Sequence, residues 1–154
     1  MVVDGFPASG RPPRQRERYG RGVDSGDARI QRSGDNAAVW SELHDGTGDI
    51  VVNRYFERAL PWPVEFEMWV IPEGGHEGVH AHGADDPDGY SGAREVYLIV
   101  EGKARVTLGE QVHSFGPGDA FAADPALPRG IANVGAGPLR IVVLNDPGPP
   151  LAGS

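Results

Sequence analysis

The chain has 154 residues, of which 39% are hydrophobic and 23% charged, with a formal net charge of −8 and no cysteine. This length allows one domain with a hydrophobic core and is short for two. Without cysteine, disulfides, thiolate metal sites and cysteine nucleophiles are excluded. The negative charge repels a phosphate backbone, so nucleic acid is not expected as a partner.

Short runs of Val, Ile, Phe, Tyr and Trp are separated by many of the 23 Gly and 14 Pro residues. Apolar runs bounded by turn residues are typical of strands, so the composition predicts an all-β barrel or sandwich. No window approaches the ~18 apolar residues of a membrane-spanning helix. The N-terminus also lacks the charged and apolar regions of a signal peptide. We therefore expect no membrane contact and a cytoplasmic location.

The two ends of the chain differ in composition from its centre. Residues 1–34 carry seven Arg and four acidic residues among Gly, Ser and Pro, in no period. Their few apolar residues cannot bury a face, so we expect a disordered basic tail, solvated or draped over a partner subunit. The Pro- and Gly-rich residues 147–154 predict a flexible C-terminus. The domain itself is expected to span residues 35–146.

Within the domain, alternation and turn residues place the strands in chain order. The predicted strands cover residues 38–43, 50–56, 64–71, a segment through His80 and His82, 95–101, 103–108, 111–115, 120–123, 130–134 and 139–145. In 64–71 the even-numbered residues, all apolar, share one face. The polar segment 83–94 is long for a strand connection and is typical of a lid or binding loop.

His80 and His82 are two residues apart, so on a strand both imidazoles face the same side. Glu95 begins the strand signal that ends before Gly102. If that strand pairs beside the histidine strand, two nitrogens and one carboxylate converge as ligands for a transition metal. The ligand types fit Fe, Zn, Mn or Ni. His76 or His113 could supply a third imidazole.

These residues carry a family resemblance. Gly74, five residues, His80-Ala81-His82, and then Glu95, six residues and Gly102 resemble the first motif of the cupin superfamily. The segment from Pro117-Gly118-Asp119 to Asn133 resembles the second motif. The resemblance covers residues 64–145 and implies a double-stranded β-helix, the jelly-roll barrel of that superfamily, often as a homodimer.

The sequence departs from the family pattern in two places. Twelve residues separate His82 from Glu95, where the pattern has only a few. Position 129 is Arg, where the second motif ends with a metal-binding His. Because arginine keeps its proton and has no lone pair to donate, the predicted ligands are His80, His82 and Glu95, and an extra imidazole would have to come from His76 or His113.

Two further residues are candidates for catalysis. Arg129 is predicted either to anchor a carboxylate or enolate of a substrate or to form a structural pair with Asp124. Tyr97 shares the face of Glu95, where its hydroxyl could move a proton or simply pack.

The sequence thus predicts a metal-dependent cupin enzyme that acts on a small oxygenated organic molecule. The reaction would be an oxygenation, or a non-redox isomerisation, cyclisation or dehydration, and a tailoring step in specialised metabolism would suit it. Two alternatives stay open. One is a binding or sensing barrel without turnover, and the other is a metal-free epimerase or isomerase with His80 or His82 as its base.

Overall fold

The computed structural model describes residues 24–25, 28–57, 64–84, 86 and 90–146. The strands are β1 (Asp24–Ser25), β2 (Ala28–Arg29), β3 (Ala37–Ser41), β4 (Asp49–Arg54), β5 (Glu65–Ile71), β6 (His76–His80), β7 (Arg94–Glu101), β8 (Ala104–Leu108), β9 (Gln111–Phe115), β10 (Ala120–Ala123), β11 (Arg129–Asn133) and β12 (Leu139–Asp146). A short 3-10 turn, η1 (Leu43–Asp45), is the one helical element among the described residues. No helix in that part of the chain is long and apolar enough to cross a membrane.

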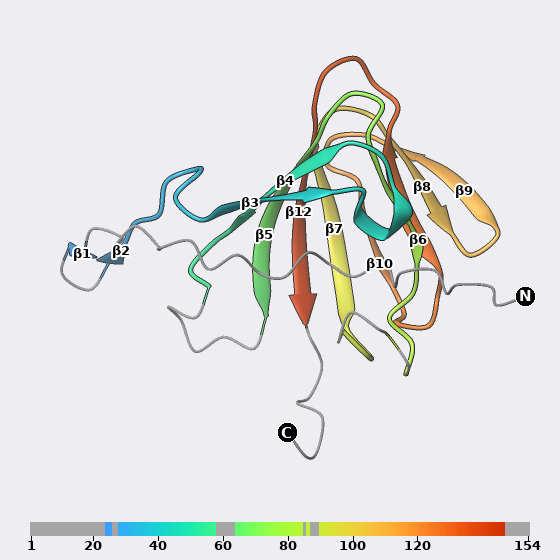
Figure 1. Cartoon of the computed structure of the whole chain (residues 1–154), viewed down its shortest axis with the longest axis horizontal. Coiled ribbons are helices and arrows are strands. Elements are labelled where there is room, and N and C mark those ends of the chain that lie inside the picture. Colours follow the sequence, from blue (N-terminus) through green and yellow to red (C-terminus); the bar gives the residue numbers. More distant parts are fainter. Residues whose placement is uncertain (1–23, 26–27, 58–63, 85, 87–89, 147–154) are drawn as a thin grey trace, which may run out of the picture.

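Two antiparallel sheets form the barrel (Figure 1). The larger sheet has six strands in the order β10-β7-β12-β5-β4-β3, and the smaller has four in the order β6-β11-β8-β9. The all-β fold class predicted from the strand and turn pattern is therefore confirmed. The strands at 111–115 and 120–123 have the predicted ends, and the other strands predicted with stated ends shift by one or two residues. The histidine strand ends at His80, short of His82, and the two-residue strands β1 and β2 were not predicted.

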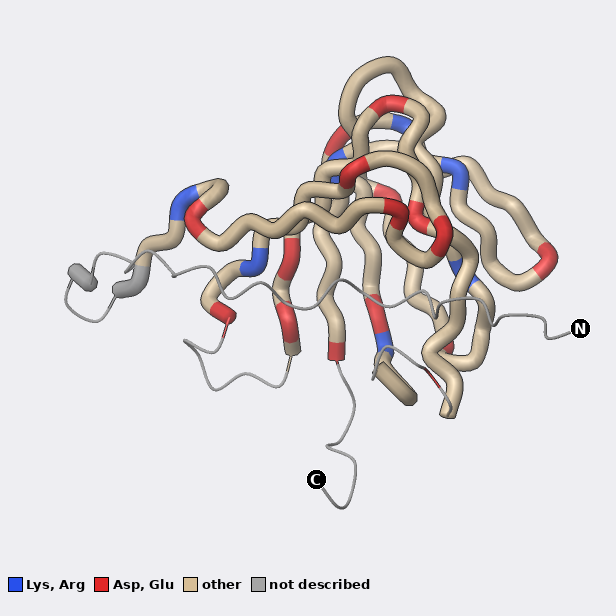
Figure 2. Tube along the Cα trace, viewed as in Figure 1, with Lys and Arg blue, Asp and Glu red and all other residues tan. Residues whose placement is uncertain are grey.

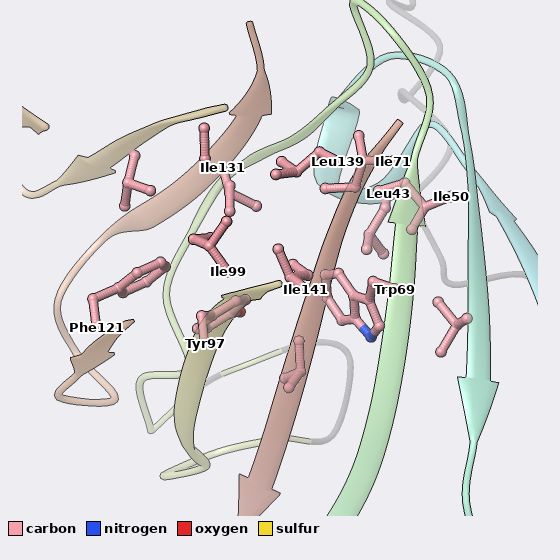
Figure 3. Close-up of a cluster of buried hydrophobic side chains, with 14 of the residues drawn as sticks. Leu43, Ile50, Trp69, Ile71, Tyr97, Ile99, Phe121, Ile131, Leu139 and Ile141 are labelled. Atoms are coloured by element: carbon pink, nitrogen blue, oxygen red, sulfur yellow. The ribbon is translucent and has the colours of Figure 1, made fainter. Parts of the chain in front are cut away.

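The hydrophobic core lies between the inner faces of the two sheets (Figure 3). Burial alternates along β7 and β12, as period two requires for strands with one covered face. Trp69, Tyr97 and Ile141 are buried inside the barrel, and the ring of Trp69 meets the ring of Tyr97 edge-on. On β5 the inner residues are Glu67, Trp69 and Ile71, so its even-numbered apolar residues face outward.

The barrel's contacts begin ahead of the predicted boundary at residue 35. Gln31 donates to the carbonyl of Arg54 at 2.6 Å and accepts from the amide of Phe56 at 2.7 Å. The Gly34 amide donates to Asn53. Residues 1–23 of the predicted tail and the predicted flexible segment 147–154 lie outside the described residues.

The sheet pairing expected at the site is wrong. The strand of Glu95 does not pair beside the histidine strand: β7 lies between β10 and β12 in the large sheet, while β6 pairs with β11 in the small one. Glu95 and His80 therefore approach each other across the barrel interior from opposite sheets. Both strands point these side chains inward, so the predicted convergence arises by a different route.

Candidate metal centre

A β-bulge in β6 brings Glu77 and His80 to the same side. Opposite β11, His80 pairs with Arg129 and Glu77 pairs with Ile131, so β6 uses one more residue than its partner over this stretch. An extra residue reverses the alternation of side chains. Gly130 lies against the bulge, where a Cβ would come within 3.2 Å of the Glu77 carbonyl oxygen. Glu77 and His80 consequently both face inward, with 3.7 Å between His80 Nε2 and Glu77 Oε1.

His80 offers a buried nitrogen toward the barrel interior. Its Nδ1 lies 3.1 Å from the carbonyl of Gly78, which places the ring proton on Nδ1 and the lone pair on Nε2. Nε2 is buried and has no hydrogen-bond partner. Burial lowers the pKa of His80 to about 4. The imidazole is therefore neutral at pH 7, as a metal ligand must be.

His82 lies just beyond the end of β6 and is fixed by the segment that follows. Its amide donates to the Pro125 carbonyl, and its Nδ1 lies 2.5 Å from Oδ2 of Asp86. Its Nε2 is 3.3 Å from Oε2 of Glu95. When one ring nitrogen of a histidine binds a metal, the other nitrogen usually donates a hydrogen bond to a carboxylate, as Nδ1 of His82 can to Asp86. Asp86 belongs to the segment predicted as a lid or binding loop.

Glu95 is held ionised by its neighbours. Its Oε2 accepts from the Tyr97 hydroxyl at 2.9 Å and from Arg129 Nη2 at 2.6 Å. Burial raises the pKa of Glu95, but the hydrogen bonds and charges of His82 and Arg129 outweigh burial and bring it down to about 2. Arg129 and Tyr97 thus position the one predicted carboxylate ligand.

Arg129 is fully buried, and its guanidinium also donates to the Pro125 carbonyl at 3.1 Å. Asp124, the structural partner suggested by the sequence, is exposed, and the carboxylate that Arg129 pairs with is Glu95. The contact of Arg129 with a substrate anion stays a prediction. In this structure the guanidinium of Arg129 donates a hydrogen bond to the Glu95 carboxylate.

Tyr97 faces the barrel interior beside Glu95, as the period of two predicts. Burial raises the pKa of its hydroxyl well above the usual value, so the group stays protonated and acts as a donor. Its ring stacks on Phe121 with 4.6 Å between centroids. A proton-transfer role for Tyr97 stays a prediction.

Neither of the two spare histidines joins the centre. His113 is exposed on β9, in the small sheet. His76 is half-buried at the start of β6, where its backbone pairs with Thr47. The described residues form two groups with metal-ligand spacing, and both groups omit His76 and His113.

Sequence reasoning missed His44. The sequence predicted only a turn here, but the ring of His44 stacks on that of His80 with 3.6 Å between centroids and 11° between planes. His44 Nε2 lies 3.7 Å from Glu77 Oε1. A histidine beside the glycines at positions 46 and 48 was the available signal, since such glycines allow a turn to pack closely on a strand.

The two groups of potential ligands share His80. The first is the predicted set of His80, His82 and Glu95, and the second is His44, Glu77 and His80; within each group, the ligand atoms lie within 4.8 Å of one another. Imidazole and carboxylate donors suit Fe, Zn, Mn or Ni. The open Nε2 of His80 fits a metal, because a buried nitrogen without a partner otherwise carries a desolvation cost.

The fold and this centre define a small jelly-roll barrel with imidazole and carboxylate donors gathered in its interior. The sequence model of the cupin domain family matches residues 67–145, and the chain belongs to this family. No curated protein matches the sequence.

Solved structures support the same fold. A predicted oxalate decarboxylase from Thermotoga maritima is similar with a TM-score of 0.62 and 19% identity, over 72% of this chain and 91% of its own. A putative sugar phosphate isomerase from Acidithiobacillus ferrooxidans has a TM-score of 0.52 and 18% identity, over 63% of this chain and 58% of its own. KdgF from a Halomonas species has a TM-score of 0.50 and 18% identity, over 63% of this chain and 78% of its own. At such identities the likeness shows the fold.

Proposed function

We propose that this cupin domain is a metal-dependent enzyme that acts on a small oxygenated organic molecule. The observation that carries the proposal is the neutral, buried His80, whose Nε2 has no hydrogen-bond partner and belongs to both groups of potential ligands. The sequence assigned His82 and Glu95 as the other ligands, and their spacing supports that assignment. A divalent ion here would polarise a substrate oxygen, for an oxygenation or a non-redox isomerisation, cyclisation or dehydration.

Residues around the candidate centre hold the proposed ligands in place for a divalent metal ion. The Gly78 carbonyl fixes the tautomer of His80, and Asp86 holds the ring of His82. Arg129 and Tyr97 keep Glu95 ionised and in place. Preorganised donors of this kind favour a bound ion because they need not rearrange on binding.

The direct test is the metal content of the full chain purified without chelator or affinity tag. We expect close to one equivalent of Fe, Zn, Mn or Ni per chain, and its loss in His80→Ala. His113→Ala, which removes an exposed histidine, is the matched control and should keep the metal. A protein that holds no metal and takes up none on titration would refute the proposal.

A specific contact favours a second candidate. The pairing of His82 with Asp86 resembles a general base oriented by a carboxylate, which a metal-free epimerase or isomerase would use. Chelation separates the two candidates, because it abolishes turnover by the first and leaves the second active. A compound that raises the melting temperature and is never consumed would instead indicate a binding barrel.

A further inference from the structure

We propose that Asn145 binds the substrate of this centre, and that its Oδ1 accepts a hydrogen bond from an alcohol hydroxyl of that substrate. The inference rests on the proposed function, because it names the substrate class of the same site: a small molecule with a hydroxyl group near the oxygen that is polarised there. Three features carry it: the unpaired amide oxygen of Asn145, its place beside Glu95, and the charges around it.

The buried asparagines of the described residues differ in how their side chains are paired. They are Asn53, Asn133 and Asn145, each 4% or 5% exposed. The side-chain NH₂ of Asn133 shares its hydrogens among three carbonyls, and its Oδ1 accepts from the Gly135 amide. The Oδ1 of Asn53 accepts from the Gly34 amide. The Oδ1 of Asn145 is buried and has no hydrogen-bond partner, so of these three asparagines Asn145 is the one with an acceptor to offer a ligand.

The neighbour of Asn145 on β5 identifies the unpaired atom. Asn145 Nδ2 lies 3.0 Å from Oε2 of Glu65. Because a carboxylate accepts hydrogen bonds, the end of the amide that faces Glu65 is the NH₂ donor, and the unpaired atom is the carbonyl oxygen. With the NH₂ turned toward β5, Oδ1 is turned away from Glu65. A buried carbonyl oxygen without a donor is costly, which is typical of a group whose partner is a ligand.

Asn145 lies beside Glu95 on the inner face of the large sheet. The two residues are directly opposite each other on β12 and β7, so their Cβ atoms are roughly 5 Å apart on the same face. Acidic residues of β5 and β7 lie on either side of β12 (Figure 2). Near Glu95 are two more buried atoms without a hydrogen-bond partner, Nε2 of His80 and Nε of Arg129. Unpaired polar atoms thus gather around Glu95, as expected where a ligand binds.

The sheet holds Asn145 in a fixed position. Its strand, β12, is paired on both sides, with Glu65 of β5 and Glu95 of β7 opposite Asn145. The hydrogen bond from Nδ2 to Glu65 fixes the side chain as well. A donor that reaches Oδ1 therefore meets an acceptor that needs no rearrangement, and such preorganisation favours selective binding.

The charges of the site decide which donor suits Oδ1 of Asn145. The carboxylate of Glu95 already has a cation in Arg129, at 2.6 Å. A divalent ion at the centre would repel an ammonium group at close range, so a neutral donor is favoured. An alcohol hydroxyl is such a donor, and hydroxy acids, hydroxy ketones and sugars carry it next to a second oxygen. The substrate is therefore assigned to the hydroxylated members of the oxygenated molecules.

A first test asks whether Asn145 serves a ligand or the fold. Leu has the branched shape of Asn without its polar atoms, so Asn145→Leu removes the unpaired oxygen and leaves the half-buried Glu65 to be solvated. We expect its melting temperature in EDTA to rise or to fall by no more than about 2 °C. Asn133→Leu is the matched control. It leaves three carbonyls and the Gly135 amide without their partner, and should melt more than about 5 °C lower.

Ligand-observed NMR titrations of the Zn²⁺-loaded full chain test the hydroxyl contact itself. Each series of probes keeps one carbon skeleton and changes a single group from hydroxyl to amine to hydrogen: lactate, alanine and propionate; glycolate, glycine and acetate; glucose, glucosamine and 2-deoxyglucose. In at least one series the hydroxyl member should bind at least about 10-fold more tightly than both counterparts. Asn145→Leu should reduce that difference to less than about 3-fold, and His113→Ala should keep it. Asn145→Ala takes the place of Asn145→Leu if that variant does not fold.

Several outcomes would overturn the inference. One is a wild type that prefers the hydroxyl member in no series, which would mean that water alone bonds to Oδ1. Another is a hydroxyl preference that Asn145→Leu leaves unchanged, since the hydroxyl would then be bound by another group. A preference for the amine members, or a melting temperature of Asn145→Leu as low as that of Asn133→Leu, would also overturn it.

Repeating the titrations in EDTA separates this inference from the proposed function. A chain that takes up no metal, yet shows a hydroxyl preference that depends on Asn145, would overturn the metal requirement and support the hydroxyl contact. A chain that holds its metal and shows no such preference would leave the proposed function standing and overturn the inference.

Discussion

The buried pair of Arg129 and Glu95 should stabilise the fold in a pH-dependent manner. Their charged atoms lie 2.6 Å apart, with the two side chains 0% and 7% exposed. Burial raises the pKa of Glu95, yet His82 and Arg129 lower it from 4.5 to about 2. One unit of pKa corresponds to about 1.4 kcal/mol, so ionised Glu95 contributes ~3 kcal/mol to stability at neutral pH.

Arg129→Met keeps the bulk of the side chain and removes its cation. We expect it to lower the free energy of unfolding by ~3 kcal/mol at pH 7, because a buried carboxylate loses its charged partner. A depressed carboxyl pKa gives stability that is present above the unfolded value of 4.5 and lost as the pH falls toward 2. The difference between wild type and variant should therefore be largest at pH 7 and shrink below pH 4.5.

Urea denaturation followed by tryptophan fluorescence, with EDTA present throughout, measures this difference across the pH range. Arg140→Met is the control, because its ion pair with Glu101 is exposed and should contribute no more than about 1 kcal/mol. Adding Glu95→Gln to Arg129→Met should recover part of the loss. The reasoning fails if Arg129→Met costs no more than Arg140→Met, or if its cost does not change with pH.

Two further predictions concern the contacts that hold the site. Gly78→Ala should destabilise the chain by more than about 2 kcal/mol, since its Cβ would overlap the His44 carbonyl; Gly83→Ala, with open space around it, should be nearly neutral in a thermal melt. Asn133→Ala should lower the free energy of unfolding by roughly 3 kcal/mol in urea, because the buried side-chain NH₂ of Asn133 shares its two hydrogens among the carbonyls of Ile71, Pro72 and Gly137. These contacts tie the end of β11 to the end of β5 and to the turn before β12. A change below 1 kcal/mol, about one average hydrogen bond, would contradict this.

Much of the fold could be predicted because the signals for a strand lie within the strand and the residues that flank it. Alternation and flanking Gly or Pro depend on neighbouring residues only, and the strands at 111–115 and 120–123 were predicted with the observed ends. Pairing depends on residues far apart in the chain. The sequence could not show that β7 would lie in one sheet and β6 in the other, and the pairing predicted for them was wrong.

The orientation of β5 shows why an apolar face is not always the inner one. Its even-numbered residues are apolar, but its inner face carries Glu67. Glu67 is accommodated because Arg54 donates to it at 2.9 Å and the Trp69 indole at 2.7 Å. Burying a carboxylate is tolerable only with such partners, and no local pattern reveals them. The same inversion leaves an apolar surface outside the barrel.

The candidate centre was predictable only as far as a regular strand extends. The side chains of His80, His82 and Glu95 gather as expected, although His82 lies beyond the end of β6 and Glu95 comes from the opposite sheet. Glu77 would face the other way from His80 on a regular strand, and only the bulge opposite Gly130 reverses it. His44 arrives through a left-handed turn that no periodic pattern describes. Irregular backbone thus brings His44 and Glu77 beside His80, and a sequence pattern built on regular strands cannot show this.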